Sequence, residues 1–205
     1  PPSRDEEFVP WYRKLKVGIE IGPTGNNDGD DIFMSKATGK EWIEQLVVAK
    51  AQYAVLFMKD FEFAFYASRI ARQCPNLKGR DLLRECFDEA AKHEMPIIVY
   101  QQIQYDSAAW RKFPDYRMQD VDGKDIPNRL CYNRGYLEHS KRVADELMEY
   151  EIAGFHFDML DYGFGKPYGC WCPTCRDLFQ KQHGVEMPRK RTWDELWEKF
   201  LQFRY

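Results

Sequence analysis

Residues 153–175 read AGFHFDMLDYGFGKPYGCWCPTC and combine features that packing alone seldom requires. Residues 154–157 form a short apolar and aromatic run, which is typical of a buried strand. Asp158 ends this run, Asp161 follows three residues later, and a glycine-rich loop then leads to a C-x-C-x-x-C motif. In parallel α/β folds, groups that leave the C-terminal ends of strands line the active-site face. We therefore expect the chemistry of this protein to be centred on this stretch.

Composition and charge restrict the class of protein. The chain has 205 residues, of which 44% are hydrophobic and 16% aromatic, enough for one large domain with a sizeable core. A net charge of −3 and a pI near 5.9 give no electrostatic reason to expect nucleic acid or an anionic membrane as a partner. No apolar run approaches the roughly 20 residues of a transmembrane helix. The first residues, Pro-Pro-Ser-Arg, include neither a methionine nor an apolar signal region, so we expect a trimmed start and a cytoplasmic protein.

Strand and helix patterns alternate upstream of this stretch. Apolar runs that end in turn or polar residues predict strands at 15–21, 53–58 and 96–100, and the run that begins near residue 153 is the fourth. Amphipathic patterns predict helices at 38–50, 81–93 and 136–150, and after the cysteines at 174–183 and 193–203. Thr38 with Glu41, and Thr192 with Glu195, have the spacing of a capping box.

Four strands, each followed by a helix, predict a parallel sheet with right-handed crossovers. The sheet is either open and doubly wound or part of a (β/α)8 barrel. No G-x-G-x-x-G motif or P-loop follows the first strand, which disfavours a nucleotide-binding sheet. Because a TIM-type barrel takes about 250 residues, we interpret residues 1–205 as a single α/β domain of the catalytic (β/α)8 type. This domain covers roughly the N-terminal half of the barrel and is incomplete at its C-terminal end.

The long connection at residues 104–133 has turn signals at Asp122-Gly123 and Ile126-Pro127. Connections of this length usually carry function or cover a surface.

The cysteines predict a structural zinc site. Cys170, Cys172 and Cys175 lie within six residues, and Cys131 precedes them on the long connection. Four thiolates make a closed tetrahedral site with no position open for water, so the Zn2+ would pin the two loops together. The alternatives are buried free thiols, or a disulfide if the protein is exported. Two further cysteines, Cys74 and Cys86, are interpreted as ordinary packing residues.

The chain resembles glycoside hydrolases over nearly its whole length. The ordered segments WYRKLKVGIEIGP, AQYAVLFMKDFEF and GFHFD are similar to the first four strands of family 29 α-L-fucosidases. The segments DVDGKDIP, CYN and D-x-x-D-Y-G ahead of C-x-C-x-x-C resemble uncharacterised glycosyl hydrolases related to those fucosidases. They also resemble family 42 β-galactosidases, in which a distant cysteine followed by Asn joins C-x-C-x-x-C in a zinc site.

The chain also departs from both families. The fucosidases carry His-Trp before the Gly-Pro of strand one and His-His-Asp after strand two, where this chain has Ile21 and Asp60-Phe61-Glu62. The galactosidases have Asn-Glu at the acid/base position, where this chain has Leu160-Asp161.

The resemblance implies a reaction for the carboxylates of the opening stretch. Glycosidases use two carboxyl groups, about 5–5.5 Å apart in retaining enzymes and further apart in inverting ones. Asp158 at a strand end is our candidate nucleophile, and Asp161 is our second candidate catalytic residue. On an extended chain the two would point to opposite sides, so they converge only if the backbone turns after Met159. The alternative is that one of them caps a helix or binds a loop amide.

Other polar residues follow the strand ends. Glu20, Lys59 and Asp60 are candidate ligands for sugar hydroxyls, and Gln101 belongs to the same set. Each is equally compatible with a satisfied polar group at the rim. His156 lies inside the fourth strand, where packing toward the helices or the barrel core is expected rather than catalysis.

The sequence thus predicts a glycoside hydrolase that cleaves an α-L-fucosyl or β-galactosyl type of bond. The alternative is a non-catalytic carbohydrate-binding or assembly module that keeps the fold. The expected partners are a carbohydrate and the missing half of the barrel, supplied by further chain or by a second subunit in a homo-oligomer.

Overall fold

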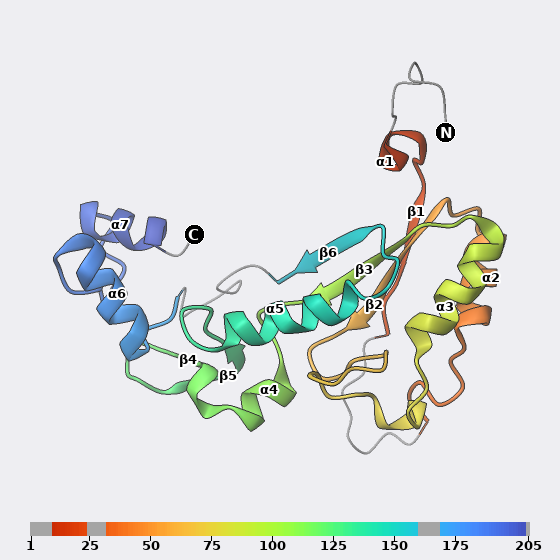
Figure 1. Cartoon of the computed structure of the whole chain (residues 1–205). Helices are drawn as coiled ribbons and strands as arrows, with labels where there is room; N and C mark the ends of the chain where they lie inside the picture. Colours follow the sequence, from red (N-terminus) through yellow and green to blue (C-terminus); the bar gives the residue numbers. More distant parts are fainter. Residues whose placement is uncertain (1–9, 24–31, 160–168, 204–205) are drawn as a thin grey trace.

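The computed structural model describes residues 10–23, 32–159 and 169–203. Four parallel strands form its central sheet in the order β1-β2-β3-β6, where β1 is Gly18–Ile21, β2 is Tyr53–Lys59, β3 is Ile97–Gln102 and β6 is Gly154–Asp158 (Figure 1). Each pair of neighbours is parallel, in agreement with the predicted βα repeat. Between β3 and β6, the short strands β4 (Arg117–Gln119) and β5 (Asp125–Leu130) form an antiparallel hairpin.

Helices connect the parallel strands. The three crossovers contain α2 (Gly39–Val48), α3 (Leu82–Ala90) and α5 (Tyr136–Leu147). Shorter helices are α1 (Trp11–Lys14) and α4 (Ser107–Lys112), and the chain continues after β6 into α6 (Pro173–His183) and α7 (Glu195–Phe203). Three 3-10 turns lie at η1 (Pro75–Leu77), η2 (Ala91–His93) and η3 (Pro114–Tyr116). None of the helices in the described part of the chain has the length and apolar composition that a membrane span requires.

The helix ends test the predicted capping boxes. Thr38 Oγ1 accepts a hydrogen bond from the Glu41 amide at 3.2 Å, so the first cap is confirmed. The second cap is wrong by two residues, because Asp194 Oδ1 accepts from the Trp197 amide at 3.0 Å. Thr192 instead donates its hydroxyl to Asp194 Oδ1 at 2.7 Å and so supports the residue that caps the helix.

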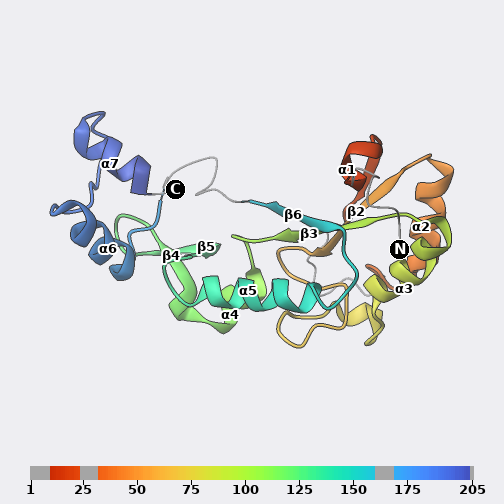
Figure 2. The same ribbon diagram turned by 45° about the horizontal axis from the view of Figure 1, so that its top comes forward.

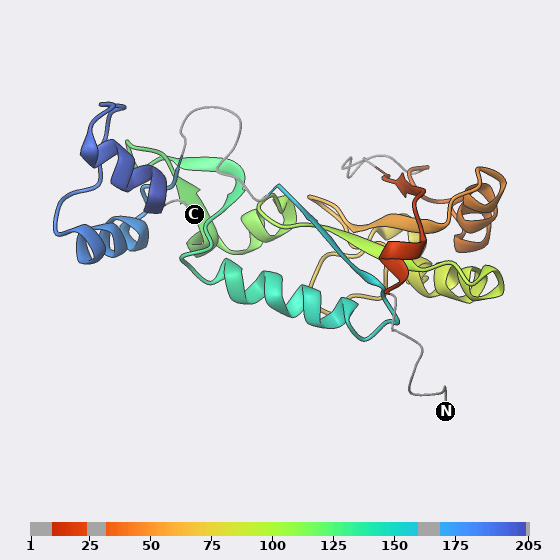
Figure 3. The same cartoon turned by 90° about the horizontal axis from the view of Figure 1, so that it is seen from above.

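One face of the sheet is covered by helices. Side chains that alternate along β2 and β3 pack against α2, α3 and α5 and are almost fully buried. The members of this helix-side core include Ala54, Leu56, Ile97, Val99, Ile43, Leu46, Leu82, Leu83, Val143 and Leu147. Figure 3 shows α3 and α5 along one side of the strands. At the contact between α2 and α3 a Cβ on Gly39 would lie 2.3 Å from the Cys86 amide nitrogen, so the close approach requires glycine there.

The opposite face of the sheet, which we call the open face, is concave. Glu20 on β1 and His156 on β6 lie three strand spacings apart, which would be roughly 14 Å on a flat sheet. That distance exceeds the combined reach of the two side chains, yet His156 Nδ1 lies 3.2 Å from Glu20 Oε2. The strands therefore curve toward each other on this side, as in part of an α/β barrel.

The long connection and the C-terminal helices build a second region, the cysteine lobe, from β4, β5, α6 and α7. Figures 1 and 2 place it at the end of the molecule opposite α2 and α3. The Asp122-Gly123 turn is confirmed, since Gly123 has φ 79° and lies between β4 and β5. The turn predicted at Ile126-Pro127 is wrong because both residues lie in β5, where Pro127 is tolerated in an edge strand.

Candidate active site and metal centre

Asp158 is the last residue of β6, at the C-terminal edge of the sheet. Its neighbour in the register is Gln102 on β3, two residues after Tyr100. The Tyr100 hydroxyl donates a hydrogen bond to Asp158 Oδ2 at 2.5 Å. Met159 then adopts φ 62°, a left-handed conformation that ends the extended backbone directly after Asp158. The carboxylate is thus fixed by a rigid strand and by one oriented donor.

Tyr100 is held on both sides of its ring. The Phe57 ring stacks on it with centroids 3.5 Å apart, and the His156 ring meets it edge-on at 5.1 Å. Burial, and then the Asp158 carboxylate, raise the pKa of Tyr100 far above its ordinary value. The phenol therefore stays protonated over the physiological range and acts only as a donor to Asp158.

His156 and Glu20 complete the row of polar groups on the open face. Both side chains are about half exposed, 46% for His156 and 43% for Glu20. His156 points to the open face, where its ring lies against Tyr100, and not toward the helices. Glu20, Tyr100, His156 and Asp158 form the cluster that we call the open-face site.

Lys59 and Asp60 lie elsewhere. Lys59 is 2% exposed, and its ammonium lies 3.1 Å from Asp106 Oδ2. Asp60 is 1% exposed, and its Oδ1 accepts hydrogen bonds from the amides of Glu62 and Phe63. Their proposed contact with sugar hydroxyls stays a prediction, to which this geometry gives no support.

Asp60 is electrostatically unusual. Its Oδ2 is buried without a hydrogen-bond partner. Burial raises the pKa of this carboxyl from 3.8 to about 6, although the Phe63 amide and Lys59 oppose the shift. The group therefore changes charge near neutral pH.

Gln101 and Asp161 are the two remaining candidates, and neither is placed in the open-face site. The Gln101 side chain faces α5 and donates to the Ser140 carbonyl at 3.3 Å, so it is part of the sheet–helix packing. Asp161 lies outside the described residues, and its role stays a prediction.

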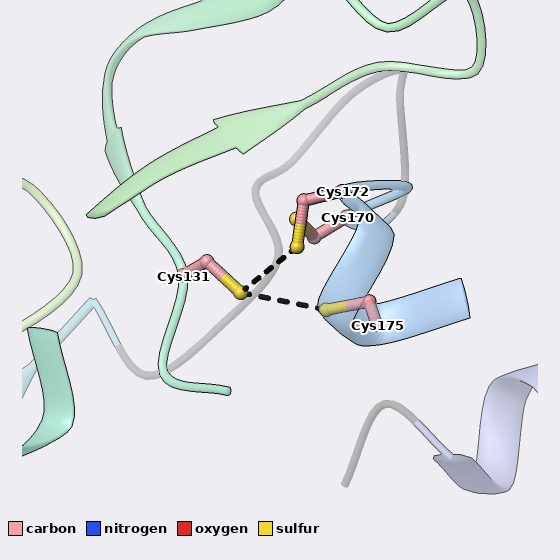
Figure 4. Close-up of side chains that lie close together, drawn as sticks. All are labelled: Cys131, Cys170, Cys172 and Cys175. Carbon is pink, nitrogen blue, oxygen red and sulfur yellow. Dashed lines mark hydrogen bonds between the residues drawn. The ribbon is translucent and has the colours of Figure 1, made fainter. Parts of the chain in front are cut away.

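The four cysteines predicted to bind zinc converge in the cysteine lobe. Cys131 follows β5, whereas Cys170, Cys172 and Cys175 lie on the loop before α6 and in its first turn (Figure 4). All four are buried, and their Sγ atoms all lie within 4.8 Å of one another. Cys131 Sγ is 3.8 Å from Cys172 Sγ and 3.4 Å from Cys175 Sγ.

This geometry fits a tetrahedral metal ion. A tetrahedron with Zn–S bonds of about 2.3 Å has edges of roughly 3.8 Å, close to the observed separations. A disulfide would need sulfur atoms about 2.05 Å apart, and all four cysteines are free thiols. The cluster is therefore compatible with a four-thiolate metal site.

The four thiols interact through hydrogen bonds. Those with Cys131, Cys170 and Cys175 lower the pKa of the Cys172 thiol, whereas those with Cys170 and Cys172 raise the pKa of the Cys131 thiol. The Asn133 side-chain amide donates to Cys175 Sγ at 3.3 Å. When a sulfur atom binds a metal, a hydrogen bond of this kind stabilises it and fixes its orientation.

Sequence reasoning did not identify two residues that matter here. The sequence pattern places Tyr100 at the end of the third strand and assigns it no role, but its pairing with His156 and its hydrogen bond to Asp158 make it part of the site. Asp106, the partner of Lys59, lies in the long connection and caps α4 by accepting from the Ala109 amide at 2.7 Å. The alternation along the third strand could have identified Tyr100, but no local pattern links Asp106 to Lys59.

Comparisons with solved structures agree with this fold. The chain is similar to α-L-fucosidase isoenzyme 2 from Paenibacillus thiaminolyticus, with a TM-score of 0.70 and 20% identity over 92% of this chain and 28% of that chain. It is also similar to a polyextremophilic β-galactosidase from the Antarctic haloarchaeon Halorubrum lacusprofundi, with a TM-score of 0.59 and 14% identity over 92% of this chain and 31% of that chain. A hypothetical protein from Ruminiclostridium thermocellum matches with a TM-score of 0.52 and 14% identity over 72% of this chain and 78% of that chain.

These likenesses concern the fold alone, because all three identities are low. The chain spans less than a third of the fucosidase and of the galactosidase. No protein-family model matches the sequence, and no curated protein matches it. The fold is therefore glycosidase-like, with a parallel sheet compatible with a partial α/β barrel.

Proposed function

We propose that this protein is a glycoside hydrolase whose nucleophile is Asp158, acting on an α-L-fucosyl or β-galactosyl type of sugar. The observation that carries the proposal is the hydrogen bond of Tyr100 to Asp158 at the C-terminal edge of the sheet. A carboxylate fixed at a strand end by an oriented phenol is suited to attack at a defined carbon atom. The likeness of the fold to a fucosidase and a galactosidase supports the same reaction class.

The mechanism follows from the arrangement of these residues. The free oxygen of Asp158 attacks the anomeric carbon while the bond to the leaving oxygen breaks, which gives a glycosyl ester that water then hydrolyses. Tyr100 keeps the carboxylate in one orientation and donates to the oxygen that does not attack. The concave open face provides the floor on which the sugar ring lies.

The cysteine cluster has a structural role in this proposal. Zinc bound by Cys131, Cys170, Cys172 and Cys175 would be closed to water and would stabilise the fold rather than take part in hydrolysis. It would tie Cys131, on the connection after β3, to the three cysteines that lie before α6 and in its first turn.

The sheet also has an edge strand that could pair with further strands. Within the described residues the outer edge of β6 makes no strand pairing. A groove of about 400 Å3 beside it is lined by Phe157, Leu137, Ala144 and Ile103. We propose that further chain or a second subunit supplies the strands that complete the barrel. Light scattering of residues 1–205 alone is expected to show self-association or aggregation, and a stable monomer would contradict this part of the proposal.

The test of the function is Asp158→Asn in the protein encoded by the complete gene. The change is nearly isosteric and removes the negative charge, so folding should survive while kcat falls by several orders of magnitude. Activity is measured on a panel of chromogenic α-L-fucosides and β-D-galactosides. Asp88→Asn, on the exposed side of α3, is the matched control and should keep the rate. Unchanged turnover of Asp158→Asn would remove Asp158 from the mechanism.

A non-catalytic carbohydrate-binding module is the second candidate. It is favoured by one observation, the burial of Lys59 and Asp60, which leaves fewer polar groups to contact a substrate. A wild-type protein that binds fucosides or galactosides but hydrolyses none of them would establish this alternative.

A further inference from the structure

We propose that His156 is the acid/base catalyst of the open-face site and that Glu20 positions it. The inference rests on the proposed glycosidase function and names the second catalytic group that such a reaction needs. It depends on the Glu20–His156 contact, which links the two outer strands of the described sheet across the open face.

The contact fixes which ring nitrogen is available. His156 Nδ1 lies 3.2 Å from Glu20 Oε2, within hydrogen-bond distance for an N–H donor and a carboxylate acceptor. A proton on Nδ1 that is shared with Glu20 leaves Nε2 as the nitrogen that exchanges protons with a substrate. The Tyr100 ring, edge-on at 5.1 Å, limits rotation of the imidazole. A carboxylate that orients a histidine in this way is the arrangement by which several enzymes prepare an acid/base group.

His156 shares the open face with Asp158. The two residues are two positions apart on β6, so their side chains leave the same face of the strand from Cα atoms roughly 6.6 Å apart. Tyr100 contacts both, because its hydroxyl donates to Asp158 Oδ2 at 2.5 Å and its ring meets the His156 ring at 5.1 Å. A sugar bound over Asp158 therefore lies beside His156.

The proton balance is complete. In the first step Asp158 forms a bond to the anomeric carbon, the bond to the leaving oxygen breaks, and the Nε2 proton of the imidazolium moves to that oxygen. In the second step the neutral Nε2 takes a proton from water, the oxygen of this water bonds to the anomeric carbon, and the ester to Asp158 breaks. Glu20 accepts the hydrogen bond from Nδ1 in both steps.

One substitution separates catalysis from structure. In His156→Asn the side-chain amide nitrogen occupies the place of Nδ1, so the hydrogen bond to Glu20 is kept and Nε2 is lost. If the pair only holds the strands together, this variant should behave like the wild type. If Nε2 is the acid/base atom, kcat/KM for phenyl glycosides should fall by about 10²-fold to 10⁴-fold. The value for 4-nitrophenyl glycosides should fall much less, because 4-nitrophenolate leaves without a proton.

The experiment uses phenyl and 4-nitrophenyl α-L-fucosides and β-D-galactosides with the protein encoded by the complete gene. Azide, which attacks without a general base, should restore turnover of the variant and give the glycosyl azide. His93→Gln serves as the control. His93 forms a similar pair with Glu89 at 3.4 Å, but this pair lies at the end of α3 and away from the open face. Equal losses on both leaving groups, or none on either, would overturn the role of His156 and leave Asp158 as nucleophile.

A second measurement does not depend on activity. The 15N chemical shifts of the His156 ring should report a proton on Nδ1 in the neutral form, and Glu20→Ala should abolish this preference. A neutral ring with its proton on Nε2 in the wild type would contradict the proposal. Wild-type protein that hydrolyses no glycoside would instead overturn the proposed function, and this inference would fall with it.

Discussion

The helix-side core and the cysteine lobe are held together in different ways. The core spreads its burial over β2, β3 and three helices, with many apolar side chains that each contribute part of the stability. In the lobe, four sulfur atoms lie within 4.8 Å of one another, and a small apolar set, including Trp171, Phe179 and Phe200, surrounds them. A distributed core loses stability gradually when it is damaged, whereas a four-thiolate metal site of the kind proposed for the lobe fails when one ligand is removed. The two regions of this chain should therefore respond very differently to single substitutions.

Cys172→Ser is expected to have the largest effect. Structural zinc sites contribute apparent binding free energies of about 10–16 kcal/mol, and losing one of four thiolates removes most of the affinity. We expect loss of the metal and of amide protection in residues 169–203, together with a looser connection at residues 104–133, while β2 keeps its protection. Elemental analysis and hydrogen exchange measure the two effects.

Cys74→Ser is the control for this prediction, because Cys74 is buried in the helix-side core and lies outside the cluster. Its metal content should match that of the wild type. Wild-type protein that is purified without chelators, contains no metal and still protects the lobe would contradict the contrast drawn above.

Leu56→Ala tests the other side of the comparison. Leu56 lies in the middle of β2, is 0% exposed and belongs to the helix-side core. Removing its buried methyl groups should lower the free energy of unfolding by about 2–5 kcal/mol without changing the metal content. Chemical denaturation measures the loss, and Val48→Ala, at a residue that is 73% exposed, should change stability little. Loss of metal from Leu56→Ala would mean that the two regions fold as one unit.

Asp60→Asn changes how the stability of the sheet region depends on pH. The pKa of Asp60 is raised from 3.8 to about 6 in the folded protein, so the native state binds the proton more tightly than the unfolded chain. The resulting stabilisation is fully present below pH 3.8 and is lost as the pH rises through about 6. Between those two pH values the contribution of Asp60 to the free energy of unfolding changes by roughly 3 kcal/mol. Asp60→Asn keeps an acceptor at Oδ1 but does not titrate. From pH 4 to pH 7 the wild type should therefore lose up to about 3 kcal/mol of unfolding free energy that the variant does not lose. Thermal melts at both pH values measure the change, and parallel pH profiles would refute it.

The smallest expected effect concerns the helix caps. Thr38→Ala removes the acceptor for the Glu41 amide and should cost about 1 kcal/mol. Thr192→Ala should cost less than half as much, because Asp194 remains as the cap of α7. Denaturation curves of the two variants give the ranking, and equal losses would restore Thr192 as a capping residue.

The outcome for Lys59 shows where sequence reasoning stops. Strict alternation along β2 would place Lys59 on the open face together with Phe57. A bulge shifts the register between these two residues, so that Phe57 pairs with Tyr100 but Lys59 pairs with Gln101 on the helix side. The buried ammonium then meets Asp106 from a segment far along the chain. Neither the bulge nor this partner leaves a local signal in the sequence.

The strands, the crossover helices and the cysteine set were predictable for the opposite reason. The strands and helices depend on periodicity within 5–15 residues, and the convergence of the cysteines was predictable from a C-x-C-x-x-C spacing that is typical of metal sites. The curvature that joins Glu20 to His156 arises from the sum of three strand pairings. For that reason the sequence predicted Asp158 as a candidate, whereas Tyr100 and the orientation of His156 required coordinates.

The separation of the cysteines along the chain has a consequence for biosynthesis. Cys131 precedes Cys172 by 41 residues, and the segment between them contains α5 and β6. At about 5–20 residues per second, a ribosome needs roughly 2–8 s to make this segment. During that interval Cys131 is an unpaired thiol on a nascent chain, and the four-sulfur cluster can close only after the strand that carries Asp158 has been synthesised. Closure of the cluster would therefore show that β6, the last of the four described parallel strands, has been synthesised.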